Sequence, residues 1–329
     1  LISIENLKDR LDKNYIFHRQ AYEGYGEDFL AKTHTHQAMY LLRYPFDQVT
    51  SVRLTTSLRH DRTAFLSTDL RNLNRDNLVK VWAGIKVEYI FDNTKTLGLN
   101  LYQGTRLKTF GEFNKQVDRN INANLFVIGA DVRHYIKIHR NLIFANRLAA
   151  SSSFGNTLLI YYLGSVDNWM NFSSKTPTFN EDVKIDYEKN WAYQSLATNM
   201  RGFSQNIRNG NSFMVFNSEL RWPIVRYFVN RPINNDFVNN FMVLGFFDVG
   251  SAWNGWTPWS ERNAYNYEEI NLGPVTAIID KNKGPFVAGY GFGLRSRLLG
   301  YYIRADWAWG IEQNEGTQKR FYLSLTLDF

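Results

Sequence analysis

The chain has 329 residues, a formal net charge of +7 and no cysteine, so disulfide bonds are excluded. Its mean hydropathy of −0.38 is typical of a soluble protein. A membrane β-barrel reaches the same average, because polar residues fill its interior. No run of about 18 apolar residues occurs, so no transmembrane helix is expected. The basic residues form no dense tract, so we expect no nucleic-acid partner.

Aromatic residues make up 16% of the chain, with 24 Phe, 19 Tyr and 9 Trp. Such enrichment is typical of the aromatic girdles of membrane barrels, although an aromatic-rich β-sandwich also fits it. The chain starts with Leu1 rather than Met and shows no signal peptide, so we expect a mature or excised chain.

In chain order, apolar and polar residues alternate with a period of two in one segment after another. The first strands are expected near residues 15–22, 37–44 and 52–59, and longer ones over 79–91, 97–108 and 131–138. The same alternation returns over 301–311 and 320–329. One face of these strands is apolar, and the other carries Arg, Lys, Asp, Gly and Tyr.

The length of the segments and the content of their polar face favour a barrel over a sandwich. The strands run for roughly 10 to 16 residues, whereas strands of globular proteins average about 5 to 6. A tilted strand needs about 9 to 11 residues to cross a bilayer. Long charged side chains on strand after strand suit a water-filled or loop-plugged interior.

The connections alternate in length, as in outer-membrane barrels. Short turns are expected at 44–48, 91–95, 138–141 and 298–300, and long outer loops at 62–77, 111–124, 156–201 and 254–283. The sequence therefore predicts one all-β domain over 1–329, an antiparallel transmembrane β-barrel with about twelve readable strands.

One constellation stands out between residues 199 and 250. An Arg-Gly-Phe tripeptide, Arg201 to Phe203, closes a long loop, and the next two strands carry Glu219 and Asp248 on their polar faces. Two acids directed into one interior require a counter-charge. A scattered network of interior salt bridges is the alternative interpretation.

These motifs resemble the BamA/TamA superfamily of outer-membrane assembly and translocation barrels. The resemblance lies in the Arg-Gly-Phe loop, the Ser-Glu-Leu strand, the Phe-x-Asp-x-Gly strand and the late Gly-Phe-Gly-Leu-Arg strand, in order between Met200 and Phe329. A weaker similarity covers YPFDQ and the stretch from Asp92 to Arg106.

The resemblance implies that Arg201 folds into the barrel and pairs with Glu219 and Asp248. It also implies that Gly202 lets the loop approach the wall, and that Phe203 wedges against Phe246 and Leu244. Family barrels have sixteen strands, so the first strands and any periplasmic domain are expected to be upstream or missing. Phe329, with Leu327 and Tyr322, resembles the C-terminal insertion signal of such barrels, although Phe329 also suits a plain interface aromatic.

The implied function is a non-enzymatic barrel in the outer membrane of a Gram-negative bacterium that assists insertion or translocation of proteins. Expected partners are outer-membrane lipid and lipopolysaccharide, unfolded outer-membrane protein clients, and periplasmic or surface subunits. No cofactor is expected. The alternative is a passive pore, or a structural anchor of a larger complex.

A hydrolase is the third possibility, with His60, Asp61, His34 and His36 as its only candidates. They lack further ligands at metal spacing and a nearby nucleophile arrangement, so neither a metal site nor catalysis is expected. The loop WNGWTPW, from Trp253 to Trp259, fits the outer interface belt, or binding of a carbohydrate or a partner.

Overall fold

The structure is a computed structural model. It describes residues 11–26, 29–66, 76–118, 122–171, 177–186, 189–229, 231, 233–260, 263, 265–272, 275–313, 315–316 and 319–325. No helix within these residues is long and apolar enough to cross a membrane. The chain divides into two compact units, one of residues 1–91, 109–128 and 154–157 and the other of residues 92–108, 129–153 and 158–329.

One antiparallel sheet contains 14 of the described strands, in the order β1-β2-β3-β4-β6-β7-β8-β12-β13-β16-β17-β18, with β19 beside β17 and β5 beside β6. Without the short strands β5 (Lys95–Gly98) and β18 (Glu315–Gly316), twelve strands remain, the number expected from the sequence. The all-β, antiparallel architecture is therefore confirmed.

The first unit begins with four strands in sequence order: β1 (Asp12–Gly26), β2 (Phe29–Pro45), β3 (Thr50–Leu66) and β4 (Leu78–Asp92). The last residue of β4, Asp92, belongs to the other unit. Thr35 on β2 donates a hydrogen bond of 2.6 Å to Asp61 on β3, and both side chains are buried. Leu58 on β3 and Ile85 and Val87 on β4 lie on the other face of the sheet and are exposed. Polar side chains thus lie on the inner face and apolar ones on the outer face.

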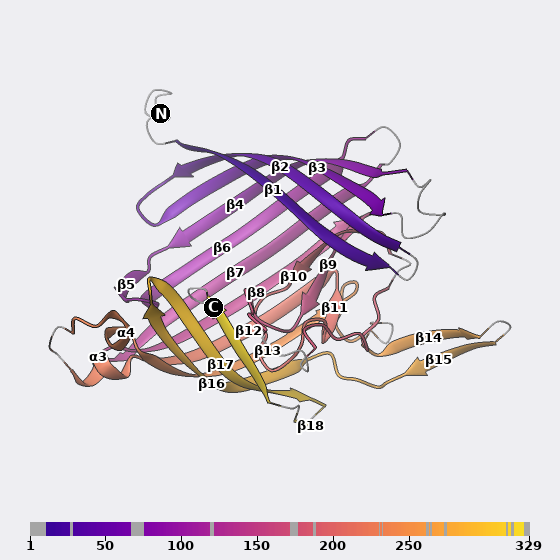
Figure 1. Cartoon of the computed structure of the whole chain (residues 1–329). Helices are drawn as coiled ribbons and strands as arrows, with labels where there is room; N and C mark the ends of the chain where they lie inside the picture. The colour runs from indigo at the N-terminus through magenta and orange to yellow at the C-terminus, as the bar shows by residue number, and fades with distance from the viewer. Residues whose placement is uncertain are drawn as a thin grey trace. The chain divides into compact units, whose positions relative to one another are not determined.

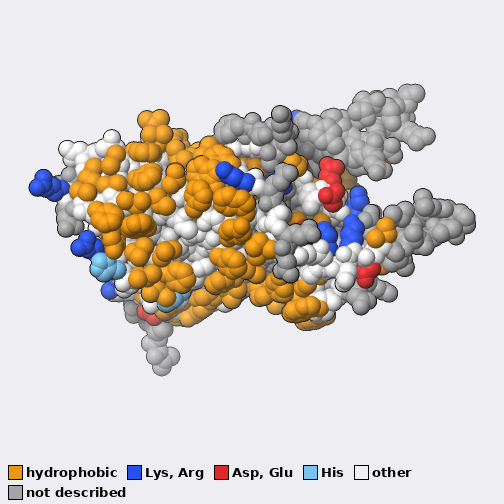
Figure 2. Space-filling model, turned by 90° about the horizontal axis from the view of Figure 1, so that it is seen from below, with side chains coloured by type: hydrophobic (Ala, Val, Ile, Leu, Met, Phe, Trp, Pro, Cys, Tyr) orange, Lys and Arg blue, Asp and Glu red, His pale blue; other side chains and the backbone are white. Residues whose placement is uncertain are grey.

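Strands β6 (Leu101–Gln116) and β7 (Asn124–His139) contribute residues to both units. The second unit continues with β8 (Leu142–Gly155), β12 (Ser212–Trp222), β13 (Met242–Trp253), β16 (Val287–Leu298), β17 (Tyr301–Glu312) and β19 (Arg320–Leu325) (Figure 1). On β12, Asn217, Glu219 and Arg221 are buried, whereas Phe216 and Leu220, which have the alternate parity, are exposed. Hydrophobic side chains cover much of the surface seen in Figure 2. An apolar exterior around a polar interior is the pattern of a barrel in lipid.

The long connections hold further structure. Strands β9 (Leu158–Leu163), β10 (Trp191–Leu196) and β11 (Arg208–Gly210) form a three-stranded sheet, and β14 (Tyr267–Leu272) pairs with β15 (Val275–Asp280). Two short helices, α3 (Ile224–Phe228) and α4 (Asp236–Asn239), lie between β12 and β13.

Two predicted loop boundaries were wrong. Residues 62–66 continue β3, and residues 111–116 continue β6, because each stretch remains paired or packed with its neighbour. The rings of Phe113 on β6 and Phe126 on β7 are 4.4 Å apart. The strands therefore extend past the length that a bilayer crossing requires.

Candidate functional site

The candidate site lies on the buried face of β12 and β13. In the register of these strands, Asn217 pairs with Asp248 and Glu219 pairs with Phe246. Glu219 and Asp248 are therefore diagonal neighbours, close enough for one long side chain to reach both. Each is at most 2% exposed.

Arg201 occupies the space between these two acids. Its Nε and Nη2 donate hydrogen bonds of 2.7 Å each to the two carboxylate oxygens of Asp248, and its Nη1 donates one of 2.6 Å to Glu219. Its backbone N–H also donates to Asp248, at 3.2 Å. The structure thus brings together the three charged residues that the sequence singled out, in a bidentate arrangement that only arginine can make.

The environment of Arg201 excludes water. The residue is 1% exposed, and its guanidinium lies 3.7 Å from the centre of the Phe246 ring, in cation–π geometry. A buried cation is tolerated only with partners of opposite charge, and here two carboxylates provide them. Removal of the Arg201 side chain, or of the carboxylates of Glu219 and Asp248, therefore leaves a buried charge without its partner.

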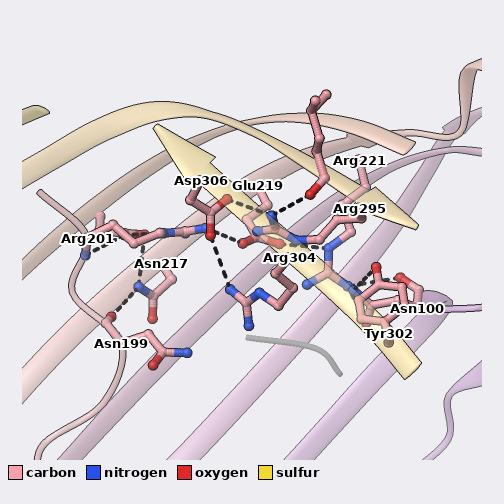
Figure 3. Close-up of polar contacts among 12 residues, drawn as sticks. Asn100, Asn199, Arg201, Asn217, Glu219, Arg221, Arg295, Tyr302, Arg304 and Asp306 are labelled. Carbon is pink, nitrogen blue, oxygen red and sulfur yellow. Dashed lines mark hydrogen bonds and ion pairs between the residues drawn. The ribbon is translucent and has the colours of Figure 1, made fainter. Parts of the chain in front are cut away.

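The polar network extends beyond Arg201 (Figure 3). The second oxygen of Glu219 accepts a 2.8 Å hydrogen bond from Nε of Arg221. Arg221 also donates to the backbone carbonyl of Asn100, whose side chain donates to the hydroxyl of Tyr302 at 3.1 Å. We call Arg201, Glu219 and Asp248 the Arg201 group. Through Glu219 and Arg221, this group is connected to Asn100 in the turn between β5 and β6, and through Asn100 to Tyr302 on β17.

A second ion-pair group lies on β16 and β17. Asp306 is 2.6 Å from Arg295 and 3.8 Å from Arg304, and all three are about 1–2% exposed. A Cβ at Gly293 would overlap the Asp306 carboxylate and come within 2.7 Å of Arg295. The Gly-Phe-Gly-Leu-Arg motif thus supplies both a cation and the space that it occupies.

The loop that carries Arg201 follows the wall closely. We call residues 199–204 the Arg201 loop. Gly202 has φ +101°, and a Cβ on it would lie 2.7 Å from the backbone nitrogen of Gly310 on β17. Asn217 donates a hydrogen bond of 2.9 Å to the carbonyl of Asn199 at the start of the loop. Glycine is the residue that permits both this dihedral angle and this approach.

The position of Phe203 differs from the expectation. It packs in a buried cluster with Met200, Leu163, Phe213 and Val215. Leu244 and Phe246 belong to another cluster. The reason is that Arg201 itself covers the Phe246 ring, so that Phe203 turns toward β9 and β12.

Tyr322 on β19 contacts the same loop. Its hydroxyl donates a 2.7 Å hydrogen bond to the carbonyl of Phe203 and accepts one of 3.1 Å from the N–H of Gly202. Tyr322 is completely buried. Leu327 and Phe329, grouped with it as an insertion signal, lie outside the described residues. Sequence reasoning missed this contact, although the alternation of β19 places Tyr322 on the polar face.

A second connection joins the loop region to β19. Ser165 pairs with Met200, and the N–H of Ser165 donates to the carbonyl of Phe203 at 3.1 Å. A few residues later, Trp169 pairs with Ser324, and the N–H of Met170 donates to the carbonyl of Leu323 at 2.8 Å. The segment 165–170 therefore runs from the Arg201 loop to the backbone of β19.

Another buried arginine was not expected from the sequence. Arg208 is fully buried, donates a 2.8 Å hydrogen bond to Glu312, and lies 4.7 Å from the ring centre of Tyr265. Arg208 follows Arg201 by seven residues, and Glu312 lies at the end of β17. No local sequence pattern links these two residues, so their pairing could not be predicted.

The hydrolase candidates lie on opposite faces of the sheet, with the three histidines on one face and Asp61 on the other. Asp61 accepts hydrogen bonds from Thr35 and Arg59, whereas His60 has the opposite parity on β3 and is exposed. Within the described residues, no group of three or more His, Asp or Glu side chains could hold a metal ion.

The tryptophan loop is held at its base and exposed at its tip. Asn263 accepts a 2.8 Å hydrogen bond from the N–H of Asn254, and the hydroxyl of Tyr265 donates to the carbonyl of Pro258. Trp256 is 90% exposed and Trp259 is 69% exposed. Both the interface and the binding interpretations of this loop stay predictions.

Solved structures resemble this chain over nearly its whole length. BamA from Haemophilus ducreyi, in a form lacking POTRA domains 1–3, matches with a TM-score of 0.58 and 15% identity, over 97% of this chain and 60% of that one. This chain thus spans less than two thirds of that structure. CdiB from Escherichia coli matches with a TM-score of 0.47 and 11% identity, over 96% of this chain and 49% of that one. The translocator domain of autotransporter NalP from Neisseria meningitidis matches with a TM-score of 0.29 and 10% identity, over 97% of this chain and 87% of that one.

No curated protein shows a significant match to the chain. The family model of the Omp85 superfamily domain matches residues 102–329, which is more than half of the chain and includes every residue of the Arg201 group. Together with the exposed apolar faces of the strands, this match identifies the chain as an outer-membrane β-barrel of a Gram-negative bacterium that belongs to the Omp85 superfamily.

Proposed function

We propose that this barrel assists the insertion or translocation of proteins at the outer membrane, without catalysing a chemical reaction, and that the Arg201 loop is required for it. Its clients are unfolded outer-membrane proteins, and its other partners are periplasmic or surface subunits. The Omp85 membership and the buried Arg201 group support the proposal.

The Arg201 group is the observation that carries the proposal. An ordinary pore needs no loop anchored by a fully buried cation, since ordering a long loop costs conformational entropy at every residue. Here the loop is held by Asp248 and Glu219 on the wall and by Tyr322 near the C-terminus. The conformation of the loop and the position of the last described strand are therefore coupled.

The test is complementation in the bacterium that carries the protein, with the wild-type copy depleted. We expect Arg201→Ala to reduce the amounts of correctly folded outer-membrane barrels, measured by their heat-dependent gel mobility. Arg201→Lys should also fail, because lysine cannot make the bidentate pair with Asp248. Arg297→Ala is the matched control, since Arg297 forms an exposed pair with Asp236 at 3.4 Å.

The alternative function, a passive pore or anchor, makes a different prediction. If depletion of the whole protein leaves the amounts of client barrels unchanged and alters only the uptake of small solutes, the assembly proposal is wrong. Variants that accumulate unfolded in the periplasm must be set aside, so the gel mobility of the barrel itself is measured in the same samples.

A further inference from the structure

The outer face of β1, β2 and β3 carries a row of basic side chains. Arg19 pairs with His36 across β1 and β2, and His36 pairs with His60 across β2 and β3. In the same ladder His34 pairs with Arg62. Directly paired residues of neighbouring strands have side chains on the same face, about 5 Å apart. These five residues, Arg19, His34, His36, His60 and Arg62, are called the basic cluster.

The cluster faces away from the interior. Thr33 and Thr35, which alternate with His34 and His36 on β2, are buried. Arg19, His60 and Arg62 are exposed, and His34 and His36 are half-exposed. Along the outer parity of β3, the residues before His60 are apolar or small, and Leu58 is 54% exposed. The cluster thus borders the apolar surface of the barrel.

The cluster lies about one bilayer crossing from the β2–β3 turn. From Val52, just after this turn, to His60 the chain counts nine residues. Eight steps of about 3.4 Å, tilted by about 40°, rise roughly 21 Å, close to the apolar band of about 25 Å. Because short turns mark the periplasmic side, the basic cluster lies at the outer boundary of the membrane.

None of the five residues pairs with an acid in the register of these strands. The outer parities of β2 from 32 to 44, of β3 from 52 to 64 and of β4 from 79 to 91 contain no Asp or Glu, and the acid on the outer parity of β1, Glu23, pairs with Lys32. Within the described part of the chain, no hydrogen bond or ion pair is found for the five side chains of the cluster. Arg19 and Arg62 thus place two permanent positive charges on this face without an acid opposite them. The site therefore calls for an anion.

We propose that the basic cluster binds the phosphate headgroups of lipids in the outer leaflet. An arginine fork matches two phosphate oxygens, and imidazole N–H groups donate to others. The adjoining apolar surface, with Phe17 75% exposed on β1, contacts the acyl chains of the same lipid. Neither feature belongs to the Arg201 group, so the site is separate from the proposed assembly function.

The test measures lipid retention by the full chain, refolded in detergent micelles, by native mass spectrometry. The probe is the bisphosphorylated lipid anchor of lipopolysaccharide, compared with its dephosphorylated form. We expect the wild type to retain the phosphorylated form, and Arg19→Gln/Arg62→Gln to bind it at least about tenfold more weakly, because this variant loses both charge-assisted donors to the phosphate groups.

The matched control removes two exposed lysines outside the cluster, Lys13→Gln on β1 and Lys95→Gln on β5, and should retain the lipid as the wild type does. His36→Gln/His60→Gln should give an intermediate loss. All variants should keep the heat-dependent gel mobility of the wild type, because the altered side chains form no hydrogen bond or ion pair among the described residues.

Three results would overturn the proposal. Equal retention by the arginine and lysine variants would show that the cluster does not bind the lipid. Equal retention of the dephosphorylated form would assign binding to the acyl chains. Displacement of the lipid by an equal concentration of inorganic phosphate would make the cluster a site for free anions instead.

Discussion

A side chain at position 202 would meet two obstacles at once, the φ of +101° and the backbone of Gly310 at 2.7 Å. Alanine in the left-handed region costs about 1–2 kcal/mol from its dihedral angle alone. Gly202→Ala should therefore lower the free energy of unfolding by more than this amount and displace the Arg201 loop. Urea titration of the refolded barrel measures the first effect, and protease sensitivity of the loop measures the second.

Gly300→Ala is the matched control, because Gly300 has φ +86° with no atom within 4 Å of the added Cβ. It should show the dihedral cost only. If the two variants lose the same stability and Gly202→Ala leaves the loop protected, the close approach to Gly310 contributes nothing.

The hydroxyl of Tyr322 satisfies two backbone groups of the Arg201 loop, at 2.7 and 3.1 Å. Tyr322→Phe retains the ring, which packs against Trp169 with centroids 5.0 Å apart, and leaves the buried N–H of Gly202 without this acceptor. We expect a loss of about 1–3 kcal/mol in urea unfolding. Tyr290→Phe, on the exposed face of β16, should be neutral. A neutral Tyr322→Phe would rule out the coupling of β19 to the loop.

Strand β16 has a glycine, Gly289, where the backbone of the Arg201 loop passes close to it. A Cβ at Gly289 would overlap the carbonyl oxygen of Arg201. Gly289→Ala should therefore expose the loop to protease although β16 itself stays paired with β13 and β17. Gly245→Ala on β13, where the added Cβ has no atom within 4 Å, should leave the loop protected. The same digestion pattern for both variants would contradict this role of β16.

The turn between β2 and β3 depends on one carboxylate. The backbone N–H groups of Val49 and Thr50 donate to Asp47 at 2.8 and 2.6 Å, and the bond from Val49 is the main cause that lowers the pKa of Asp47. A lowered pKa in the folded state means that the carboxylate stabilises the turn above its usual pKa, and that this stabilisation is lost as the pH falls through the lowered value.

Asp47→Asn should therefore be less stable than the wild type at neutral pH, and this difference should begin to shrink below about pH 4 and disappear once the pH has fallen through the lowered pKa of Asp47. Hydrogen exchange of the Val49 and Thr50 amides, followed against pH, measures the opening of this turn directly. A difference that does not change between pH 7 and pH 2 would show that the charge of Asp47 has no part in it.

At the scale of the whole molecule, the strand pattern could be predicted from the sequence because a barrel wall has a strict period of two. The need of the two acids for a counter-charge could also be predicted, and the resemblance to a known family implied that Arg201 provides it. The packing of Phe203 and the contact of Tyr322 could not be predicted. They depend on how residues distant in the sequence meet in the interior, as Phe203 and Leu163 do, and as Gly202 and Tyr322 do across 120 positions.

The extensions of β3 and β6 beyond the membrane were missed for a related reason. Their residues are polar enough to read as loops, and only the pairing with neighbouring strands keeps them extended. The position of Arg208 beside Glu312, 104 residues later in the chain, is likewise fixed by the fold and by no local pattern.

The central claim, that a buried ion-pair group holds the Arg201 loop against the wall, is tested most directly by a double-mutant cycle of Arg201→Ala and Asp248→Ala in urea unfolding. Each single change should cost about 3–5 kcal/mol, because it leaves a buried charge without its partner, and the double variant should cost little more than either. The exposed pair Arg297 and Asp236 is the control cycle, with an expected coupling of about 0–1 kcal/mol. Additive losses at Arg201 and Asp248 would contradict the account.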